Sequence, residues 1–456
     1  IRLPSGVGHI GKEIVIQTAH HYNWVNLGSA INHPDVGKKF DLSEETNKEI
    51  GIEDSSCFII PSNGYGTPDL LRHIIKEEKI DAVFIITDPR YFDWLFQIEN
   101  EIRKKTPIIY LNIWDDLPAP MYNKAFYESC DALLGISKQT VNINKMVLGE
   151  KAKGKVIDYV PHGLNPKMFF PINKESEEFI KFKNEATKGK EKDFILFFNS
   201  RNIRRKSIPD ALLAWKYFTD TLPKEKADKC LFILHTELIS DHGTDLNAVH
   251  DYIFGEDNST VIFSTQKLST PQMNYFYNLA DAQILLSSAE GWGLSLTEAL
   301  LTGTPIIANV TGGMQDQMRF EDENGEWYTP NPDIPSNHRK TYTKCGKWAF
   351  PIFPSNLSLV GSPQTPYIWD DRCNPEDAAA HLTTLYNMTS EEREKLGKEG
   401  YNWAHSEEAG FTSPQMAKRV MDSVDKLFNT WHPRLNYELI NANEVEENRV
   451  PHKLLY

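Results

Sequence analysis

The chain has 456 residues and a formal net charge of −14 at pH 7. This length predicts two or three domains, and the acidic balance argues against nucleic acid or an anionic membrane as partners, because like charges repel. Hydrophobic residues make up 40% and charged residues 25%, as in an ordinary soluble protein. No apolar run approaches the roughly 20 residues that span a bilayer.

The cysteines and the first residues bear on the compartment. Five scattered cysteines without a Cys-x-x-Cys spacing predict neither a disulfide framework nor a zinc site, and they favour a cytoplasmic location. Ile1–Gly6 lacks the basic and apolar regions of a secretory signal and is expected to be the remnant of a strand.

The first part of the chain alternates between strand and helix patterns. Helices are expected at Asp69–Glu78 and Ala119–Ser129. The expected strands are Ser56–Pro61, Ala82–Thr87, Pro107–Ile113, Ala132–Ser137 and Val156–Val160. The turn-rich stretch Tyr159–Pro171 and the charged segment after it predict a first domain at 1–165 and a linker at 166–192.

A second α/β series follows the linker. Its expected strands are Phe194–Asn199, Leu231–His235, Val261–Ser264, Ala282–Ser287 and Pro305–Val310. Pro209–Asp220 reads as a helix with Ser207 as its cap. Spacings near 30 residues suit right-handed βαβ units, so we expect an α/β chain with two doubly wound domains facing a cleft.

The last third departs from this rhythm. We expect the second domain to cover 193–405 with an insertion at 318–372, which is rich in Pro, Asn, Asp and aromatic residues. A long irregular segment of this composition is either functional, as a wall or lid over a site, or a structural cover. Helices are expected from Pro375 and at Ser413–Thr430, and the segment 406–456 is expected to pack back towards the first domain.

Two acids lie at and just after the end of a predicted strand. Glu290 follows the strand Ala282–Ser287, and Glu298 lies seven residues inside the next segment, after a glycine-rich turn. Open α/β sheets bind ligands at the carboxyl ends of their strands, and carboxylates there suit a polyhydroxylated ligand. The alternatives are an ordinary loop acid for Glu290 and a capping box, Ser295-x-x-Glu298, for the second acid.

A basic segment follows another strand. Arg201, Arg204, Arg205 and Lys206 come directly after Phe194–Asn199, so Arg201 and Lys206 are expected to face the same crevice as Glu290 and to neutralise a diphosphate. The alternatives are a solvated basic loop or a nucleic-acid patch, and the overall acidity disfavours the second.

Gly6-Val-Gly8-His-Ile-Gly11 matches the dinucleotide fingerprint G-x-G-x-x-G. A nicotinamide-dependent oxidoreductase would need a complete strand before it and a ribose-binding acid about 20 residues later. Only five residues precede Gly6, and Asp35 lies in a turn-like stretch. A glycine turn that brings amides near a phosphate is better supported.

Trp114-Asp115-Asp116 ends the strand Pro107–Ile113. Two adjacent acids without a third spaced ligand make a poor magnesium site. Either acid could orient an acceptor hydroxyl, and Asp115 is the candidate catalytic residue. The alternative is a strand-end turn that caps a helix. His162 reads as a turn residue near the hinge or as a ligand contact.

Six segments occur together in one order. They are Gly6–Gly8, Cys130–Ser137, Val160–Asn165 with Phe170-Pro171, Arg201-x4-Lys206, Glu290-x7-Glu298 and Gly303–Ala308. Together they resemble the retaining GT-B glycosyltransferases of the family 4 type (glycosyltransferase group 1). The resemblance runs from residue 1 to about 310 and includes the final helix.

The resemblance implies a donor site and a reaction. Arg201 and Lys206 would hold the diphosphate of a nucleoside-diphosphate sugar, with UDP or GDP as the expected nucleotide. Glu298 would bind the ribose hydroxyls and Glu290 the transferred sugar. The backbone amides of Gly291, Trp292, Gly293 and Leu294 would also contact the donor. Gly6 and Gly8 would leave room for its sugar and phosphate.

The implied reaction is hexosyl transfer to a sugar or glycan hydroxyl, with retention and with the leaving phosphate as base. No cofactor and no metal is expected, because Arg, Lys and helix amides supply the charge stabilisation.

This chain also departs from the family pattern. Trp114 stands where many relatives have a histidine, and His162 stands where the hinge motif usually has an asparagine. Two other functions stay open: an NAD(P)-dependent oxidoreductase, and a non-catalytic GT-B protein that binds a sugar nucleotide. A GT-B epimerase or phosphorylase would need a general base or a pyridoxal-bearing lysine, and no residue in the sequence suggests either.

Overall fold

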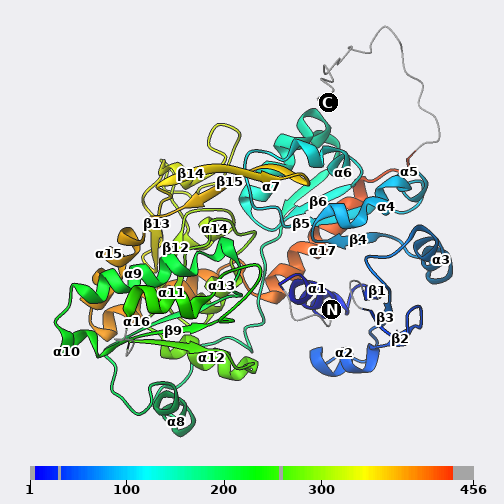
Figure 1. Cartoon of the computed structure of the whole chain (residues 1–456). Coiled ribbons are helices and arrows are strands. Elements are labelled where there is room, and N and C mark those ends of the chain that lie inside the picture. Colours follow the sequence, from blue (N-terminus) through cyan, green and yellow to red (C-terminus); the bar gives the residue numbers. More distant parts are fainter. Residues whose placement is uncertain (1–5, 29–31, 256–259, 435–456) are drawn as a thin grey trace.

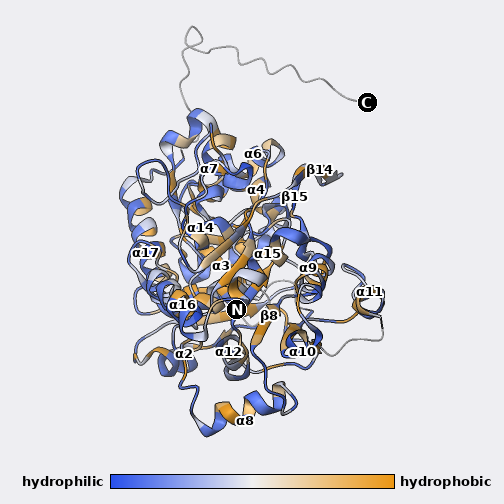
Figure 2. Ribbon diagram, turned by 90° about the vertical axis from the view of Figure 1, so that its left-hand side faces the viewer, coloured by the Kyte–Doolittle hydropathy of each residue, from blue (hydrophilic) through white to orange (hydrophobic). Residues whose placement is uncertain are grey.

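The computed structural model describes residues 6–28, 32–255 and 260–434. The chain folds into two α/β bodies that are joined by two crossings of the backbone (Figure 1). Hydrophobic residues concentrate on the central strands, and hydrophilic residues cover the outer helices (Figure 2).

The N-terminal body contains two sheets. One is parallel with the order β4-β5-β6-β7, and the other has the order β1-β3-β2, in which β1 is parallel and β2 antiparallel to β3. The strands are β1 (Trp24–Gly28), β2 (Phe40–Asp41), β3 (Cys57–Pro61), β4 (Val83–Ile86), β5 (Ile108–Asn112), β6 (Ala132–Gly135) and β7 (Val156–Tyr159). The helices are α1 (Gly6–Thr18), α2 (Ser43–Ile50), α3 (Pro68–Glu78), α4 (Asp93–Gln97), α5 (Glu99–Ile102), α6 (Lys124–Glu128) and α7 (Lys138–Leu148).

Strand β5 shows why its sheet is covered on both faces. All five of its residues are buried. Ile109 and Leu111 belong to the core that includes Ile10 of α1, whereas Ile108 and Tyr110 belong to a second core on the opposite face. Successive side chains of a strand point to opposite faces, so a continuous apolar run produces two covered faces.

The C-terminal body is built on one six-stranded parallel sheet with the order β10-β9-β8-β11-β12-β13. Its strands are β8 (Phe194–Asn199), β9 (Cys230–His235), β10 (Val261–Ser264), β11 (Ala282–Leu285), β12 (Ile306–Asn309) and β13 (Ala349–Ile352). Its helices are α8 (Glu177–Ala186), α9 (Ile208–Asp220), α10 (Lys224–Ala227), α11 (Leu246–Phe254), α12 (Thr270–Leu279), α13 (Leu294–Leu301), α14 (Met314–Met318), α15 (Pro375–Tyr386) and α16 (Ser390–His405). Because the strand order reverses between β8 and β11, the loops after these two strands meet at the switch point where such sheets bind ligands.

Most of the expected strands and helices are present with ends shifted by one or two residues. The helix expected at Ala119–Ser129 is shorter than predicted and consists of the 3₁₀ turn Met121–Asn123 followed directly by α6. Ser207 occupies the predicted N-cap position of α9, but it has a left-handed conformation and its side chain makes no capping hydrogen bond.

The segment 318–372 is ordered and has two parts. Its strand β13 completes the six-stranded sheet, and the side chains of Trp327 and Trp348 are buried in the core of this body. Strands β14 (Asn356–Ser362) and β15 (Thr365–Arg372) then form an antiparallel hairpin that extends towards α7 and β5 of the N-terminal body (Figure 1).

The two crossings of the backbone lie side by side. Leu164 N donates to Phe411 O at 3.0 Å, and Ser413 N donates to Leu164 O at 2.7 Å. A Cβ atom at Gly163 would lie 2.3 Å from Thr412 O, so only glycine allows this approach. Helix α17 (Ser413–Thr430) then returns to the N-terminal body and packs against α1, β6 and β7.

Part of the expected linker is docked on the C-terminal body. Phe170 N donates to Asn274 Oδ1 at 3.1 Å, and Ile172 N donates to Asn278 Oδ1 at 2.9 Å, both on α12. Within the described ranges, none of the helices combines the length and the apolar character that crossing a bilayer would need.

Candidate functional site

The loops that follow β8 and β11 bring opposite charges together. After β8 the chain forms a 3₁₀ turn, Arg204–Lys206, and Lys206 Nζ donates to Glu290 Oε1. Arg205 Nη1 lies 3.0 Å from Glu290 Oε2, and Ser287 Oγ donates to Glu290 Oε1 at 2.8 Å. Glu290 is only 5% exposed and Lys206 is largely covered, whereas the side chain of Arg205 is 42% exposed, so the cluster extends from the interior of the switch point to the surface.

The charges in this cluster depend on one another. Burial opposes ionisation of Glu290, but Arg205 and Lys206 outweigh it and lower the pKa of this carboxyl to about 2. Burial also lowers the pKa of Lys206 in spite of the neighbouring carboxylate. The ionised pair is therefore held together in a site where an anionic ligand would compete with Glu290 for Lys206.

Arg201 does not join this cluster. Its side chain is exposed and makes no ion pair or hydrogen bond within the described part of the chain. Arg205, which the sequence did not single out, takes the place beside Glu290 and also donates to Ala289 O at 2.5 Å. Both residues lie in one run of cations, and the sequence gives no signal that the backbone turns Arg205 towards the acid.

Glu298 does not cap helix α13. The cap position is Gly293, which makes no side-chain cap, and Ser295 lies inside the helix, so the capping-box alternative is wrong. Tyr277 Oη and Asn199 Nδ2 both donate to Glu298 Oε2, the second at 3.1 Å. Burial raises the pKa of Glu298 to about 7, although these two donors favour the ionised form.

The glycine turn between the two acids is closely packed. Gly293 has φ of 86°, a left-handed conformation, and a Cβ atom at Gly291 would lie 2.7 Å from Ile113 O of the N-terminal body. The indole of Trp292 is buried and donates to Thr297 Oγ1, which leaves its amide rather than its ring for a ligand. The amides from Gly291 to Leu294 donate to no carbonyl within the described ranges, so they form a cluster of free donors at the start of α13.

Asp115 and Asp116 meet this cluster from the other body. Burial raises the pKa of Asp115, which Arg205 opposes and Glu290 reinforces. Burial and the charge of Asp115 raise the pKa of Asp116 well above its usual value. Asp115 therefore faces the same junction as Glu290 and Arg205, and its charge opposes ionisation of Asp116.

Gly6 and Gly8 lie in the first turn of α1 and not in a loop. Gly6 has open space around the position of a Cβ atom, whereas Gly8 is buried. No strand precedes α1 within the described ranges, and Asp35 pairs with Lys38 at 2.5 Å in a turn. The dinucleotide fingerprint therefore lacks its structural context, and the oxidoreductase alternative is not favoured.

His162 lies in the hinge beside His9 of α1, with ring centroids 5.8 Å apart. Burial, and to a smaller extent His9, lowers the pKa of His162 to about 3, so this imidazole is neutral.

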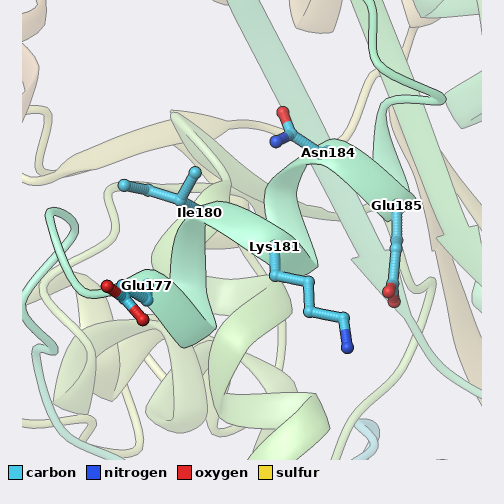
Figure 3. Close-up of a pocket in the computed structure, with 5 residues that line it drawn as sticks. All are labelled: Glu177, Ile180, Lys181, Asn184 and Glu185. Atoms are coloured by element: carbon cyan, nitrogen blue, oxygen red, sulfur yellow. The ribbon is translucent and has the colours of Figure 1, made fainter.

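A hollow of about 490 Å³ lies elsewhere, on α8 (Figure 3). Its lining residues are Glu177, Ile180, Lys181, Asn184 and Glu185, and none of them belongs to the loops after β5, β8 or β11. In the described part of the chain, no group of three His, Cys, Asp or Glu side chains is placed to hold a metal ion.

A family model described as glycosyl transferases group 1 matches residues 179–340, the segment that carries Lys206, Glu290 and Glu298. An uncharacterized glycosyltransferase of Methanocaldococcus jannaschii is 28% identical over 45% of this chain and 49% of its own length. The alpha-monoglucosyldiacylglycerol synthase of Acholeplasma laidlawii is 23% identical over 57% of this chain and 60% of its own length. The matches thus span about half the length of these curated relatives.

Solved structures match almost the whole chain at low identity. Sucrose-phosphate synthase from Thermosynechococcus elongatus has a TM-score of 0.61 at 14% identity and covers 92% of both chains. The Anabaena protein HepE, solved in complex with UDP-glucose, has a TM-score of 0.61 at 12% identity and covers 93% of this chain and 97% of its own. The predicted fold class is confirmed: this is an α/β chain with the GT-B fold, and over residues 179–340 it matches the glycosyl transferases group 1 family.

Proposed function

We propose that this protein is a retaining glycosyltransferase that moves a hexosyl group from a nucleoside-diphosphate sugar to an acceptor hydroxyl without a metal ion. The observation that carries the proposal is the pairing of the buried Glu290 with Lys206 and with the more exposed Arg205, beside the free amides at the start of α13. Cations and amides attract a diphosphate, and carboxylates accept sugar hydroxyls, so both halves of such a donor find partners at one switch point.

In this proposal the donor replaces contacts that the protein makes with itself. The diphosphate takes Lys206 from Glu290, and Arg201, which has no competing ion pair in the described ranges, closes on it from the rim. Glu290 then accepts hydroxyls of the sugar, and Glu298 exchanges Tyr277 and Asn199 for the ribose hydroxyls. The amides from Gly291 to Leu294 stabilise the negative charge that develops on the leaving group.

The chemical step is a substitution at the anomeric carbon. The acceptor oxygen forms a bond to this carbon on the face from which the diphosphate leaves, and the bond between the carbon and the phosphate oxygen breaks. The acceptor proton passes to the departing phosphate. Lys206 and the amides offset the charge on that phosphate, so the step needs no separate nucleophile and no metal.

Donor binding is tested by thermal unfolding in the presence of UDP, GDP, ADP, their common sugar conjugates, NAD and NADP. A ligand at a hundred times its dissociation constant stabilises a protein by about 2.7 kcal/mol. One nucleoside diphosphate and its sugar should raise the unfolding midpoint of the wild type but not of an Arg201→Ala/Lys206→Ala variant. Stabilisation by NAD or NADP alone would overturn the proposal.

Turnover and stereochemistry need a second measurement. The anomeric configuration of the product, read by NMR, should match that of the donor, and added EDTA should leave the rate unchanged. Glu290→Gln should abolish turnover while nucleotide binding persists. A wild type that binds the sugar nucleotide but transfers it to no acceptor would instead indicate a binding protein.

A further inference from the structure

The hairpin β14–β15 belongs to the C-terminal body but is bonded to the N-terminal one. Four hydrogen bonds join them. Arg90 Nη1 donates to Gln364 O and, at 2.7 Å, to Thr365 Oγ1, Tyr122 Oη donates to Tyr367 O at 3.3 Å, and Trp369 N donates to Leu117 O at 2.6 Å. The ring of Trp369 also packs against the core of the N-terminal body. The hairpin thus forms a wall beside the loop that carries Asp115 and Asp116.

Asp371, near the end of β15, is fixed next to the loop that carries Glu290. Its backbone N–H donates to Ser288 O at 3.1 Å, and its carbonyl accepts from Asn309 Nδ2 at 2.7 Å. Its side chain is 4% exposed, and Oδ2 lies 3.1 Å from His338 Nδ1. The other oxygen, Oδ1, has no hydrogen-bond partner among the described residues, which is unusual for a buried carboxylate.

Asp371 and Asp116 approach one another from different bodies. Burial, the neighbouring Asp115 and the charge of Asp371 all raise the pKa of Asp116, while Arg205 opposes them. Arg205 is already engaged with Glu290, and Asp371 Oδ1 has no donor among the described residues. A ligand that supplies several hydroxyl donors would satisfy it.

Two aromatic rings lie at the same junction. Tyr122 of the N-terminal body and Tyr367 of the hairpin are half-buried, with ring centroids 5.0 Å apart and planes inclined at 73°. Aromatic faces next to carboxylates suit a ligand with an apolar C–H face and hydroxyl edges.

We propose that Asp371 is a specificity-determining residue which, together with Asp116, binds hydroxyl groups of a carbohydrate acceptor, with the packed pair of Tyr122 and Tyr367 on one side of it. This inference rests on the proposed glycosyltransferase activity and adds the class of the acceptor.

The test compares Asp371→Asn with Asp370→Asn. Asp370 is the preceding residue of β15, so its side chain points to the opposite face, where it pairs with Arg372 at 2.8 Å. The initial rate of nucleoside diphosphate release is measured. The donor is the nucleotide sugar that stabilises the protein, and the acceptors are methyl glucoside, maltose and a long-chain alcohol in micelles. Asp371→Asn should raise the KM for the accepted saccharide about 10- to 100-fold and leave the donor KM unchanged, and Asp370→Asn should change neither.

A second pair of variants covers the case in which Asp371→Asn does not fold. Tyr367→Leu should weaken saccharide use, while Leu359→Ser, at a 58% exposed position on the other strand of the hairpin, should not. Equal effects within either pair, or a parallel change in donor KM, would overturn the inference. Transfer only to the micellar alcohol, or to none of the three acceptors while nucleotide binding persists, would overturn it and leave the donor site intact. Loss of nucleotide binding by the wild type would instead remove the proposed function itself.

Discussion

Lys206 and Arg204 are neighbours in one basic turn, but their surroundings differ. Lys206 pairs with the buried Glu290, whereas the side chain of Arg204 is exposed. We expect Lys206→Ala to weaken nucleoside diphosphate binding at least tenfold, because a charged hydrogen bond to phosphate contributes on the order of 1.5–3 kcal/mol. Glu290 keeps Arg205 as its partner, so the variant should remain folded.

Arg204→Ala is the matched control, since it removes a cation from the same turn. Isothermal titration calorimetry of both variants separates a specific contact from the general attraction of a basic loop. Equal losses in the two variants would contradict the role given to Lys206.

Glu298 predicts a pH dependence of donor binding. Its pKa is raised to about 7 by burial, so the carboxyl becomes protonated as the pH falls below 7. If the ionised form binds the ribose hydroxyls, protonation competes with the donor. Affinity should therefore fall by up to about tenfold per pH unit below 7, and it should level off above that value.

The measurement is the dissociation constant of the nucleoside diphosphate between pH 5.5 and 8.5. Glu298→Gln cannot titrate and should flatten the profile. A wild-type profile that already matches this variant would rule out Glu298 as the titrating group.

The sequence predicts the acids of this site better than its cations. Glu290 and Glu298 lie in the glycine-rich segment that follows the apolar strand β11. The position of this strand in the sheet therefore brings both carboxylates to the switch point. Arg201 and Arg205 lie four residues apart in a run of cations, and the 3₁₀ turn that decides which one faces Glu290 has no clear pattern. Asp371 could not be found from the sequence, because only the folded hairpin brings it to Asp116.

At the level of elements, α7 and α14 form a contact between the two bodies. Asp316 of α14 accepts from Lys138 N in the first turn of α7 at 2.9 Å, and Gln315 Nε2 donates to Gln139 Oε1 at 2.9 Å. Gln139 in turn donates to Asp115 O at 2.6 Å. The helix contact is thus connected to the loop that carries the candidate acceptor acids.

Asp316 gives this contact a pH dependence. Burial raises its pKa to about 6, above the usual value near 4, so the folded state binds a proton more tightly than the unfolded state. The resulting stabilisation is complete below about pH 4 and is lost as the pH rises through 6. Asp316→Asn keeps an acceptor for Lys138 N but cannot ionise.

We therefore compare the free energy of unfolding of Asp316→Asn with that of the wild type. The difference, variant minus wild type, should increase by on the order of 2 kcal/mol between pH 4 and pH 7. Denaturant titrations at several pH values measure this difference. A constant difference across the range would show that Asp316 does not titrate as described.

Elements with long apolar runs were predictable, and irregular ones were not. Strands such as β8 and β12 are buried on both faces, so their sequences are almost wholly apolar. Strand β1 has four half-buried residues and a mixed sequence, and β2 has two exposed residues, which left neither with a recognisable pattern. The hairpin β14–β15 takes part of its stabilisation from the other body, and a local pattern cannot report contacts of that kind.

At the level of the whole molecule, Gly163 holds the two backbone crossings together. A Cβ atom there would also lie 2.8 Å from Met416 Cβ of α17. Gly163→Ala should therefore push the crossings apart and destabilise the protein by about 1–3 kcal/mol, the usual cost of overpacking.

Gly154→Ala is the control, since nothing lies within 4 Å of a Cβ atom at that exposed glycine. Thermal unfolding should show a midpoint lower by several degrees for Gly163→Ala and close to wild type for Gly154→Ala. The same unfolding midpoint for both variants would mean that the two backbone crossings can move apart without loss of stability.

The return of α17 sets an order of events during synthesis. Ile10 of α1 and Leu111 of β5 share a core with Val420 of α17, so the N-terminal body lacks part of its cover until the last helix has been made. The six strands of the other sheet lie between Phe194 and Ile352, and that body has its complete sequence earlier. In a nascent chain stalled after His405, we expect protease to digest the N-terminal half and to spare the C-terminal body, so that the half made first is the half that matures last.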